Sequence, residues 1–432
     1  MSKDMNKGLV PKLRFPEFRD TGKWKEKKLG DFSQILRGSS PRPIDEYMTS
    51  DFNGLNWLKI GDVAQDSKYV VLTKERVLAT ALSKTREVNP GDLIMSNSMS
   101  FGRPYILKIK TCIHDGWIAV AKIDEQVSKD YLYYLILSPT SQKYFLNSAA
   151  GSGVQNLNAD IIKQLPILIT KYSEQQKIAD CLSSIDQLIA AEAQKLDTLK
   201  AHKKGLMQQL FPAEGETLPK LRFPEFKDAR VWASCDLGSR TIKVGSGITP
   251  NGGDKNYINA GRPFIRSQNI GWGELLLNNV AFIDDETHAS FVSTKINDSD
   301  VFLNITGASI GRSAIADSRV IGGNVNQHVC IIRLKQKELN PTFLNQYLLS
   351  QYGQRQIDSF QAGGNRQGLN FTQVRSFSIP TPSKMEEQIR IADCLSSIDE
   401  LINVQSQKFE ALKIHKKGLM QQLFPTAEEA IA

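Results

Sequence analysis

The sequence predicts a mixed α/β (α+β) protein of two tandem modules and two long helices, with the helices pairing as an antiparallel coiled coil about a pseudo-twofold axis. Three features of the 432 residues predict this fold: an internal repeat, two stretches with heptad spacing of apolar residues, and short strand-like runs between Gly-, Ser- and Asn-rich loops. The expected boundaries are 1–172 for the first module, 173–212 for the first helix, 213–383 for the second module, and 384–432 for the second helix and the C-terminal tail.

Three sequence blocks occur twice at an offset of about 210 residues, a period that indicates duplicated domains rather than a solenoid. The copies are PKLRFPEFRD (11–20) and PKLRFPEFKD (219–228), IADCLSSID (178–186 and 391–399), and HKKGLMQQLFP (202–212 and 415–425). Between these blocks the two halves have diverged, and only short matches remain, such as Phe101-Gly102-Arg103 with Ile310-Gly311-Arg312. Identical blocks suit two copies of one partner, whereas divergent modules suit two different targets. A partial gene conversion without functional content is the alternative.

The divergent modules combine strand-like and helical patterns. WLKIGDV from Trp57 and HVCIIRL from His328 are typical of short buried strands. One helix is expected in each module, near 129–145 in the first and near 341–360 in the second. This mixture predicts an α/β module in each half of the chain.

Each long helix is marked by its breakers and its periodicity. From Ser173 to Phe211 the chain has no interior proline and a single glycine, Gly205, and Pro212 and Pro425 end the two helices. The apolar heptad positions are Leu182, Ile185, Ile189, Leu196, Leu199, Leu206 and Leu210 in the first helix, and Leu395, Ile398, Ile402, Phe409, Leu412, Leu419 and Leu423 in the second.

The polar residues in these seams predict a register. They are Glu192 and Lys203 in the first helix, and Gln405 and Lys416 in the second. An antiparallel register with Glu192 opposite Lys416, and Gln405 opposite Lys203, leaves no buried charge alone. The central pairs are then Leu199–Phe409 and Leu196–Leu412. A structure with Glu192 and Lys416 heptads apart would contradict this hypothesis. Two helices packed only on their own modules are the alternative.

A helix of about 36 residues is roughly 54 Å long at 1.5 Å per residue. Modules held at its ends could span about one turn of duplex DNA, roughly 34–36 Å between half-sites. The helices are therefore interpreted as a rigid spacer.

Composition and charge indicate a globular protein with a mild preference for a polyanionic partner. Lys and Arg number 54 against 46 Asp and Glu, so the net charge is +8. No apolar run approaches the roughly 18–20 residues of a bilayer span, and the N-terminal MSKDMNKG has no apolar signal-peptide region. Five widely spaced cysteines fit free thiols in a reducing compartment. We therefore expect a cytoplasmic protein without a membrane partner.

Loops that mix Arg and Lys with Asn, Gln, Ser and Thr hold the groups that read DNA bases: Arg or Lys is bidentate to guanine, and Asn or Gln to adenine. The DNA-binding candidates are Arg37, Ser39, Arg42, Lys59, Ser98, Arg103, Gln155 and Asn156 in the first module, and Thr249, Asn251, Arg266, Gln268, Asn269, Thr306, Arg312, Asn326, Gln327, Arg366 and Gln367 in the second. For any single residue, a solvated or turn-capping role is an equal alternative.

The sequence predicts no catalytic residue and no metal ligand. It contains no GxxxxGK(S/T), no HExxH and no paired CxxC. Asn340-Pro341-Thr342-Phe343 only partly matches the NPP(Y/F) motif of amino-methyltransferases and is expected to open a helix. The acidic run 284–286 is interpreted as a loop face, and His114 and His328 as core or loop histidines.

The duplicated LRFPEF blocks and the paired IADCLSSID…KKGLMQQLFP helices resemble the specificity (S) subunit of type I DNA restriction–modification enzymes. The resemblance covers the whole chain, and it implies two target recognition domains that each read one half of a bipartite, asymmetric DNA site. The loop Gly245–Pro250 and the segment Phe264-Ile265-Arg266-Ser267 look like the start of a recognition domain in this family, and the first module departs from that pattern at Ser40-Pro41-Arg42.

The resemblance also implies the partners. Two modification subunits would methylate adenine with S-adenosylmethionine, and ATP-dependent restriction subunits would join through them, so that S-adenosylmethionine, ATP and Mg belong to the partner subunits. The chain itself would hold no cofactor and would be non-catalytic. The residues expected to dock the modification subunits are Phe15, Phe18, Lys203, Lys204, Gln208, Phe223, Phe226, Lys416, Lys417 and Gln421.

Two other function classes remain open from the sequence. A self-sufficient nuclease or methyltransferase needs a motif that this sequence lacks. A structural adaptor that binds only proteins would show no salt-dependent affinity for DNA, whereas phosphate contacts give a steep dependence on salt.

Overall fold

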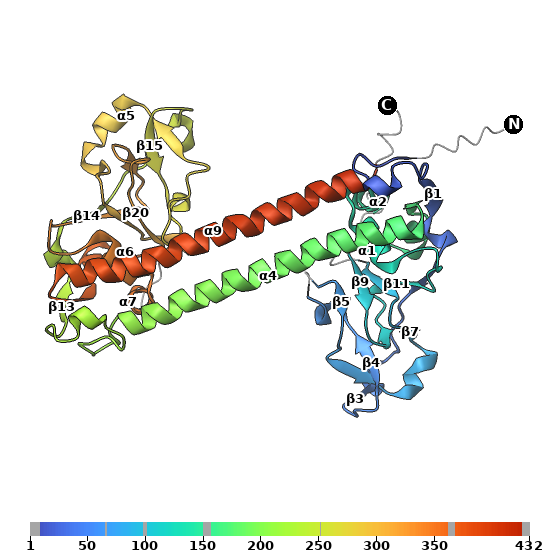
Figure 1. Ribbon diagram of the computed structural model, residues 1–432. Coiled ribbons are helices and arrows are strands. Elements are labelled where there is room, and N and C mark those ends of the chain that lie inside the picture. Colours follow the sequence, from blue (N-terminus) through green and yellow to red (C-terminus); the bar gives the residue numbers. More distant parts are fainter. Residues whose placement is uncertain are drawn as a thin grey trace. The chain divides into compact units, whose positions relative to one another are not determined.

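The computed structural model describes residues 9–64, 67–97, 102–149, 157–250, 252–361 and 368–425. The chain divides into two compact units: the first is Met1–Ala193 with Lys408–Ala432, and the second is Gln194–Gln407. Each unit contains one mixed α/β module and segments of two 39-residue helices, α4 (Tyr172–Leu210) and α9 (Met385–Leu423) (Figure 1). The predicted fold class of two tandem α/β modules with two long helices is confirmed.

The first module has two five-stranded sheets, in the orders β2-β11-β8-β9-β5 and β3-β6-β4-β10-β7, and a ribbon of β1 and β12. The strands are β1 (Lys25–Lys28), β2 (Gln34–Arg37), β3 (Met48–Thr49), β4 (Leu55–Leu58), β5 (Tyr69–Val70), β6 (Glu75–Val77), β7 (Arg86–Val88), β8 (Leu93–Ser96), β9 (Pro104–Leu107), β10 (Thr111–Ile113), β11 (Trp117–Ala121) and β12 (Pro166–Ile169). The helices are α1 (Lys129–Leu137), α2 (Pro139–Ala149) and α3 (Ala159–Lys163).

The second module has sheets in the orders β14-β20-β17-β18 and β16-β15-β19, and a ribbon of β13 and β21. The strands are β13 (Ala233–Asp236), β14 (Thr241–Ser246), β15 (Arg262–Ile265), β16 (Ala281–Ile283), β17 (Val301–Asn304), β18 (Ser313–Ile315), β19 (Asn324–Val325), β20 (Val329–Leu334) and β21 (Ser378–Thr381). The helices are α5 (Asp285–Ser290), α6 (Pro341–Leu349), α7 (Gln351–Ser359) and α8 (Phe371–Arg375).

The single helix expected in each module is two helices. In the first module the break falls at Ser138, which precedes a proline and has extended backbone angles, since a residue before proline disfavours the helical conformation. In the second module the break falls at Ser350, whose hydroxyl accepts a hydrogen bond from the Gly353 amide and so starts a new helix.

The two modules share one frame despite their divergent sequences. Strand β11 pairs with β2 and β8 in the first module as β20 pairs with β14 and β17 in the second. Parallel strands β4 and β10 correspond to parallel strands β15 and β19. The strand registers therefore show which positions of the two modules correspond. Trp117 lies opposite Ser96 in the first module, as Val329 lies opposite Asn304 in the second.

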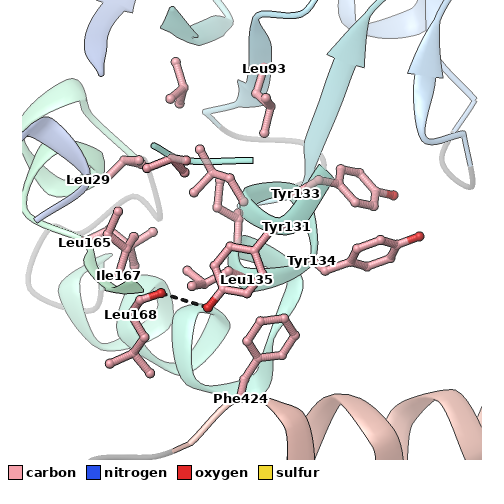
Figure 2. Packing of buried hydrophobic residues seen from close by; sticks show 14 of the residues in the cluster. Leu29, Leu93, Tyr131, Tyr133, Tyr134, Leu135, Leu165, Ile167, Leu168 and Phe424 are labelled. Carbon is pink, nitrogen blue, oxygen red and sulfur yellow. Dashed lines mark hydrogen bonds between the residues drawn. The ribbon is translucent and has the colours of Figure 1, made fainter. Parts of the chain in front are cut away.

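The central strands are apolar on both faces because both faces are covered. In β8, Leu93 and Met95 belong to the core that includes helix α1, and Ile94 belongs to the core with Leu58 of the other sheet. Figure 2 shows the first of these cores, where the Tyr131 hydroxyl donates to the Leu168 carbonyl at 2.8 Å. The Phe424 ring, just beyond α9, lies 5.6 Å from that of Tyr131, so the end of α9 is part of the core of the first unit.

Each LRFPEF block is attached to the start of a long helix by a buried ion pair. Arg14 donates from Nε and Nη2 to the two carboxylate oxygens of Glu174, at 2.7 and 2.8 Å. Arg222 makes the same two bonds to Glu387, at the same distances. The Arg and Glu side chains are at most 9% exposed. Hydrogen bonding to the carboxylates raises the pKa of both guanidinium groups above its ordinary value. This pairing gives a physical reason for the near identity of the repeated blocks.

The long helices run antiparallel within the first unit, because Asp186 contacts Lys416 at 2.5 Å and the later residue Glu192 contacts the earlier residue Lys408 at 2.5 Å. In the second unit Lys203 contacts Asp399 at 2.6 Å. The antiparallel pairing is therefore confirmed.

The predicted register is wrong by about one heptad, since Glu192 meets Lys408 and Lys416 meets Asp186. Two apolar pairs were predicted from the same register and are therefore also wrong: Leu199–Phe409 and Leu196–Leu412. The physical reason is that a long Lys side chain in the seam reaches a flanking Asp. Pairs of seam positions alone therefore do not determine the register.

Replacing Asp399 with Asn is expected to lower the free energy of unfolding by about 1–3 kcal/mol, as hydrogen bonds to charged groups contribute. Asp399 accepts from Lys203 and, at 2.7 Å, from Gln346 Nε2. Urea denaturation checks this, with Asp393→Asn as the control because Asp393 is exposed on the same helix. Equal stability of the two variants would contradict the prediction.

None of the helices in the described part of the chain has a stretch long and apolar enough to cross a membrane.

Candidate nucleic-acid interface

Three loops meet at the same edge in both modules, and the first follows the parallel strand pair. Lys59 comes directly after β4, and Arg266 comes directly after β15. In both cases the backbone amide is held by the residue three positions later: Asp62 accepts from Lys59 at 2.9 Å, and Asn269 accepts from Arg266 at 3.0 Å. Lys59 and Arg266 are therefore equivalent cations at the end of equivalent strands.

The second loop joins β10 to β11 and β19 to β20. Because Ile113 lies opposite Leu58 and Val325 lies opposite Ile265, the residues after them correspond. His114 and Asp115 in the first module thus match Asn326 and Gln327 in the second.

The third loop follows β2 and β14. It begins with a glycine in each module, because a Cβ on Gly38 would collide with the His114 carbonyl and a Cβ on Gly247 with the Val325 carbonyl. Two residues later a hydroxyl bonds to the second loop: Ser40 Oγ donates to Asp115 Oδ1 at 3.1 Å, and Thr249 Oγ1 donates to Gln327 Oε1. The same hydroxyl-to-side-chain contact therefore recurs with different chemical groups.

In the first unit these loops line a cavity of about 350 Å³. Lys59 Nζ lies 2.6 Å from Glu75 Oε2, and Arg42, whose side chain is 84% exposed, lies 3.6 Å from Asp115. The Trp57 ring forms the floor beside His114, with ring centres 6.2 Å apart. The site thus combines cations, carboxylates and an aromatic wall.

In the second unit the described counterparts of Lys59, Ser40, His114 and Asp115 are Arg266, Thr249, Asn326 and Gln327, of which only Arg266 is charged. Arg266 is half-buried, donates to the Asn279 carbonyl at 3.3 Å, and lies 5.2 Å from the centre of the Tyr257 ring. Asn269 is 1% exposed, and its amide donates to the Leu276 and Asn279 carbonyls, so its side chain anchors the loop instead of facing solvent. Asn326 is also buried, whereas Gln327 is exposed.

A further pair of arginines is equivalent. Arg103 and Arg312 each follow a glycine with positive φ, and a glutamine of the neighbouring helix donates to that glycine's carbonyl: Gln142 to Gly102 at 3.1 Å and Gln354 to Gly311 at 3.0 Å. The Arg103 guanidinium lies 5.9 Å from the Tyr105 ring centre.

Other DNA-binding candidates are spread more widely. Arg37 and Gln268 are exposed, Ser39 donates to the Lys84 carbonyl at 2.9 Å, and Thr306 contacts His328 Nδ1 at 2.5 Å. Six candidates lie outside the described residues: Ser98, Gln155, Asn156, Asn251, Arg366 and Gln367.

Sequence reasoning missed three residues of this edge: Ser40, His114 and Asp115. His114 is a loop histidine, one of the two predicted alternatives, and it also lines the cavity, with its Nε2 2.9 Å from Asp115 Oδ1. The signal that could have found them is Gly38, since Ser40 follows it as Thr249 follows Gly247.

The docking candidates fall into two groups. Phe15 and Phe223 lie under equivalent cations, Lys177 at 5.7 Å and Arg390 at 4.9 Å from the ring centres. Lys203 and Lys416 are occupied by the ion pairs between the helices. The remaining candidates are Phe18 and Gln208, which are half-buried, Phe226, which is buried, and Lys204, Lys417 and Gln421, which are exposed.

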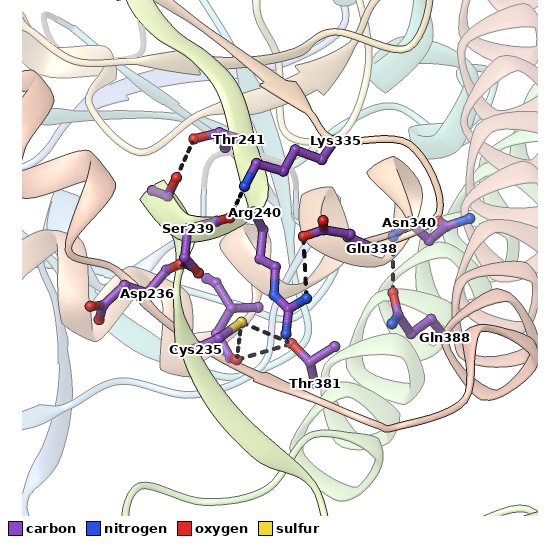
Figure 3. Close-up of polar contacts among 12 residues, drawn as sticks. Cys235, Asp236, Ser239, Arg240, Thr241, Lys335, Glu338, Asn340, Thr381 and Gln388 are labelled. Atoms are coloured by element: carbon purple, nitrogen blue, oxygen red, sulfur yellow. Dashed lines mark hydrogen bonds and ion pairs between the residues drawn. The ribbon is translucent and has the colours of Figure 1, made fainter.

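The Asn340-Pro341-Thr342-Phe343 segment is a helix cap. Asn340 Oδ1 accepts from the Phe343 backbone amide at 2.9 Å. The backbone amide of Asn340 donates to Gln388 Oε1 on α9 at 2.9 Å (Figure 3). Burial raises the pKa of the Cys112 thiol to about 11 and that of Cys330 to about 12. Among the described residues no group of three or more His, Cys, Asp or Glu side chains could hold a metal ion.

Comparison with known proteins finds a family whose model matches this chain twice. The family of the Type I restriction modification DNA specificity domain matches residues 21–201 and 244–413. The Type I restriction enzyme MjaVIII specificity subunit of Methanocaldococcus jannaschii is 22% identical over 422 residues, which cover 95% of this chain and 93% of that protein. The putative type I restriction enzyme MjaX specificity subunit of the same organism is 23% identical over 415 residues, with coverage of 93% and 92%.

A solved structure has the same fold. The Type-I restriction-modification system S subunit from M. genitalium superimposes with a TM-score of 0.61 at 15% identity, covering 97% of this chain and 100% of that one. Because the family matches both modules together with most of each long helix, this chain belongs to the type I restriction–modification DNA specificity family and carries two of its domains.

Proposed function

We propose that each unit reads one half of a bipartite, asymmetric DNA site through its three-loop edge, and that α4 and α9 set the spacing between the halves. The observation that carries this proposal is that both modules have the same strand pairing but present different side chains at the three-loop edge. Lys59, His114 and Asp115 in the first unit are replaced by Arg266, Asn326 and Gln327 in the second. Because base edges differ in donors and acceptors, such replacements give each unit its own target.

We further propose that the repeated blocks dock two modification subunits, through which restriction subunits join. Two pairs of equivalent residues support this: Phe15 and Phe223, which lie under equivalent cations, and the exposed Lys204 and Lys417. Two near-identical surfaces suit two copies of one partner. S-adenosylmethionine, ATP and Mg then act in those subunits, in the cytoplasm, and this chain is the non-catalytic specificity subunit. The division into 1–172, 173–212, 213–383 and 384–432 remains part of this proposal.

A protein-only adaptor is the alternative, and the family membership does not favour it. The two readings differ in their dependence on salt. If DNA is bound through phosphates, the logarithm of the affinity falls linearly with the logarithm of the salt concentration, whereas an adaptor shows no such slope.

Replacing Arg266 with Ala is expected to relax base preference in one half of the site only, by about ten- to a hundredfold at one position. The matched variant Lys59→Ala is expected to act on the other half only. The measurement is selection from a randomised duplex pool, using the chain copurified with its modification subunits. Equal loss at both halves would contradict modular reading, and enrichment of no split site by the wild type would favour the adaptor.

A further inference from the structure

The carboxylate of Asp115 lies in the first unit's candidate site, although Asp115 is not among the DNA-binding residues that the sequence predicts. It lies in the loop that carries Gln327 in the second unit, and it lines the 350 Å³ cavity. Its side chain is 34% exposed. A carboxylate is unexpected on a surface that binds a polyanion, because it repels phosphates.

The neighbours of Asp115 hold it in one orientation. Oδ1 accepts from Ser40 Oγ at 3.1 Å, and His114 Nε2 lies 2.9 Å from the same oxygen. His114 is itself held in place, because its Nδ1 accepts from the Gly116 amide at 2.9 Å. The Ser40 hydroxyl therefore holds the Oδ1 side of the carboxylate.

The second oxygen is the one available to a ligand. Oδ2 has Arg42 Nη2 as its cationic neighbour at 3.6 Å, which is too long for a hydrogen bond, and that arginine is 84% exposed. An ionised carboxylate only accepts hydrogen bonds. A group that binds Oδ2 must therefore be a donor.

We propose that Asp115 is a specificity-determining residue of the first unit and selects a base that presents an exocyclic amino group in the major groove. Cytosine N4 and adenine N6 are such donors, whereas guanine presents N7 and O6, and thymine O4, which are acceptors that a carboxylate repels. This inference rests on the proposed function and deepens it, because it names the chemical group that the first unit reads.

The second unit supplies the contrast. Gln327, at the equivalent position, has both a donor and an acceptor and is exposed. An amide of this kind suits the N6 and N7 pair of adenine, whereas a carboxylate suits an amino group alone. The two units therefore differ at this position in the hydrogen-bonding pattern they accept.

The test is selection from a randomised duplex pool with the full chain in complex with its modification subunits. Asp115→Asn keeps the shape and adds a donor. We expect the discrimination against guanine and thymine to fall about tenfold or more at one position of one half-site, because the added N–H can donate to their acceptors, with the other half-site unchanged. The enriched letter in the wild type distinguishes cytosine from adenine. Asp160→Asn, an equal change of charge at an exposed position of helix α3, is the control and is expected to retain the wild-type preference.

Asp115→Gln is a second variant, since it introduces the group of the second unit, and it is expected to favour adenine at the same position. An unchanged base preference in both Asp115 variants, with the split site still enriched, would overturn this inference and leave the proposed function standing. A uniform gain in the affinity of the Asp115 variants for all sequences would also overturn it, because that result indicates that the carboxylate lies near a phosphate and only repels it. If the wild type enriches no split site, the proposed function itself fails.

Discussion

Replacing Glu387 with Gln is expected to lower the free energy of unfolding by about 3–5 kcal/mol, the cost of removing one partner of a buried ion pair. Glu387 has no exposed surface and accepts from Arg222 twice and from Trp232 Nε1 at 3.1 Å. The substitution leaves the Arg222 guanidinium buried without a counter-charge. Urea denaturation followed by tryptophan fluorescence measures the loss.

Two further variants separate charge from packing. Glu386→Gln is the control, because Glu386 is the exposed neighbour on the same helix turn and is expected to change stability by less than about 0.5 kcal/mol. The double variant Arg222→Met with Glu387→Leu removes both charges together, and it is expected to recover much of the loss, since an apolar pair avoids an unpaired charge. A loss below about 1 kcal/mol for Glu387→Gln would show that the pair is not essential to the second unit.

Inserting seven residues into both long helices, after Ala193 and after Gln407, is expected to lengthen the gap between the two half-sites without changing their sequences. One heptad keeps the apolar seam in phase and adds about 10 Å at 1.5 Å per residue. At about 3.4 Å per base pair along the duplex this corresponds to about three base pairs. Selection from a randomised duplex pool reads both the gap and the half-site sequences.

A four-residue insertion at the same places is the matched control. It moves the seam out of phase, so it is expected to weaken the pairing of the helices and to reduce binding to every spacing. An unchanged gap after the seven-residue insertion would remove the role of the helices as a spacer.

The large features of the fold were predictable because they rest on local and periodic signals. Pro212 and Pro425 mark the helix ends in any structure, and the heptads of α4 and α9 predict pairing. The strand after His328 was also recognisable, since it is rich in apolar and β-branched residues. The run from Trp57 is a strand only in part, because β4 ends at Leu58 and Ile60–Asp62 form a 3-10 turn. The breaks at Ser138 and Ser350 were missed, because each depends on a single cap within a continuous helical pattern.

The candidate site was predictable only in part. Lys59, Arg266, Thr249 and Gln327 stood out by residue type and lie on the three-loop edge. Asp115 did not stand out, because a carboxylate is not a residue type expected to approach DNA. Asn269 is predicted to contact DNA because of its residue type, but its buried amide donates to carbonyls within its own loop.

By itself the sequence determined that this protein is duplicated, that each half carries an α/β module, and that two heptad helices pair, because repeats, breakers and periodicity are local in the chain. Only the tertiary structure decided the register, in which Lys416 pairs with Asp186 and Lys203 with Asp399. It also placed Ser40 beside Asp115 and Arg14 on Glu174. These partners are 75 or more residues apart, and no local pattern specifies a contact that depends on how strands and helices pack.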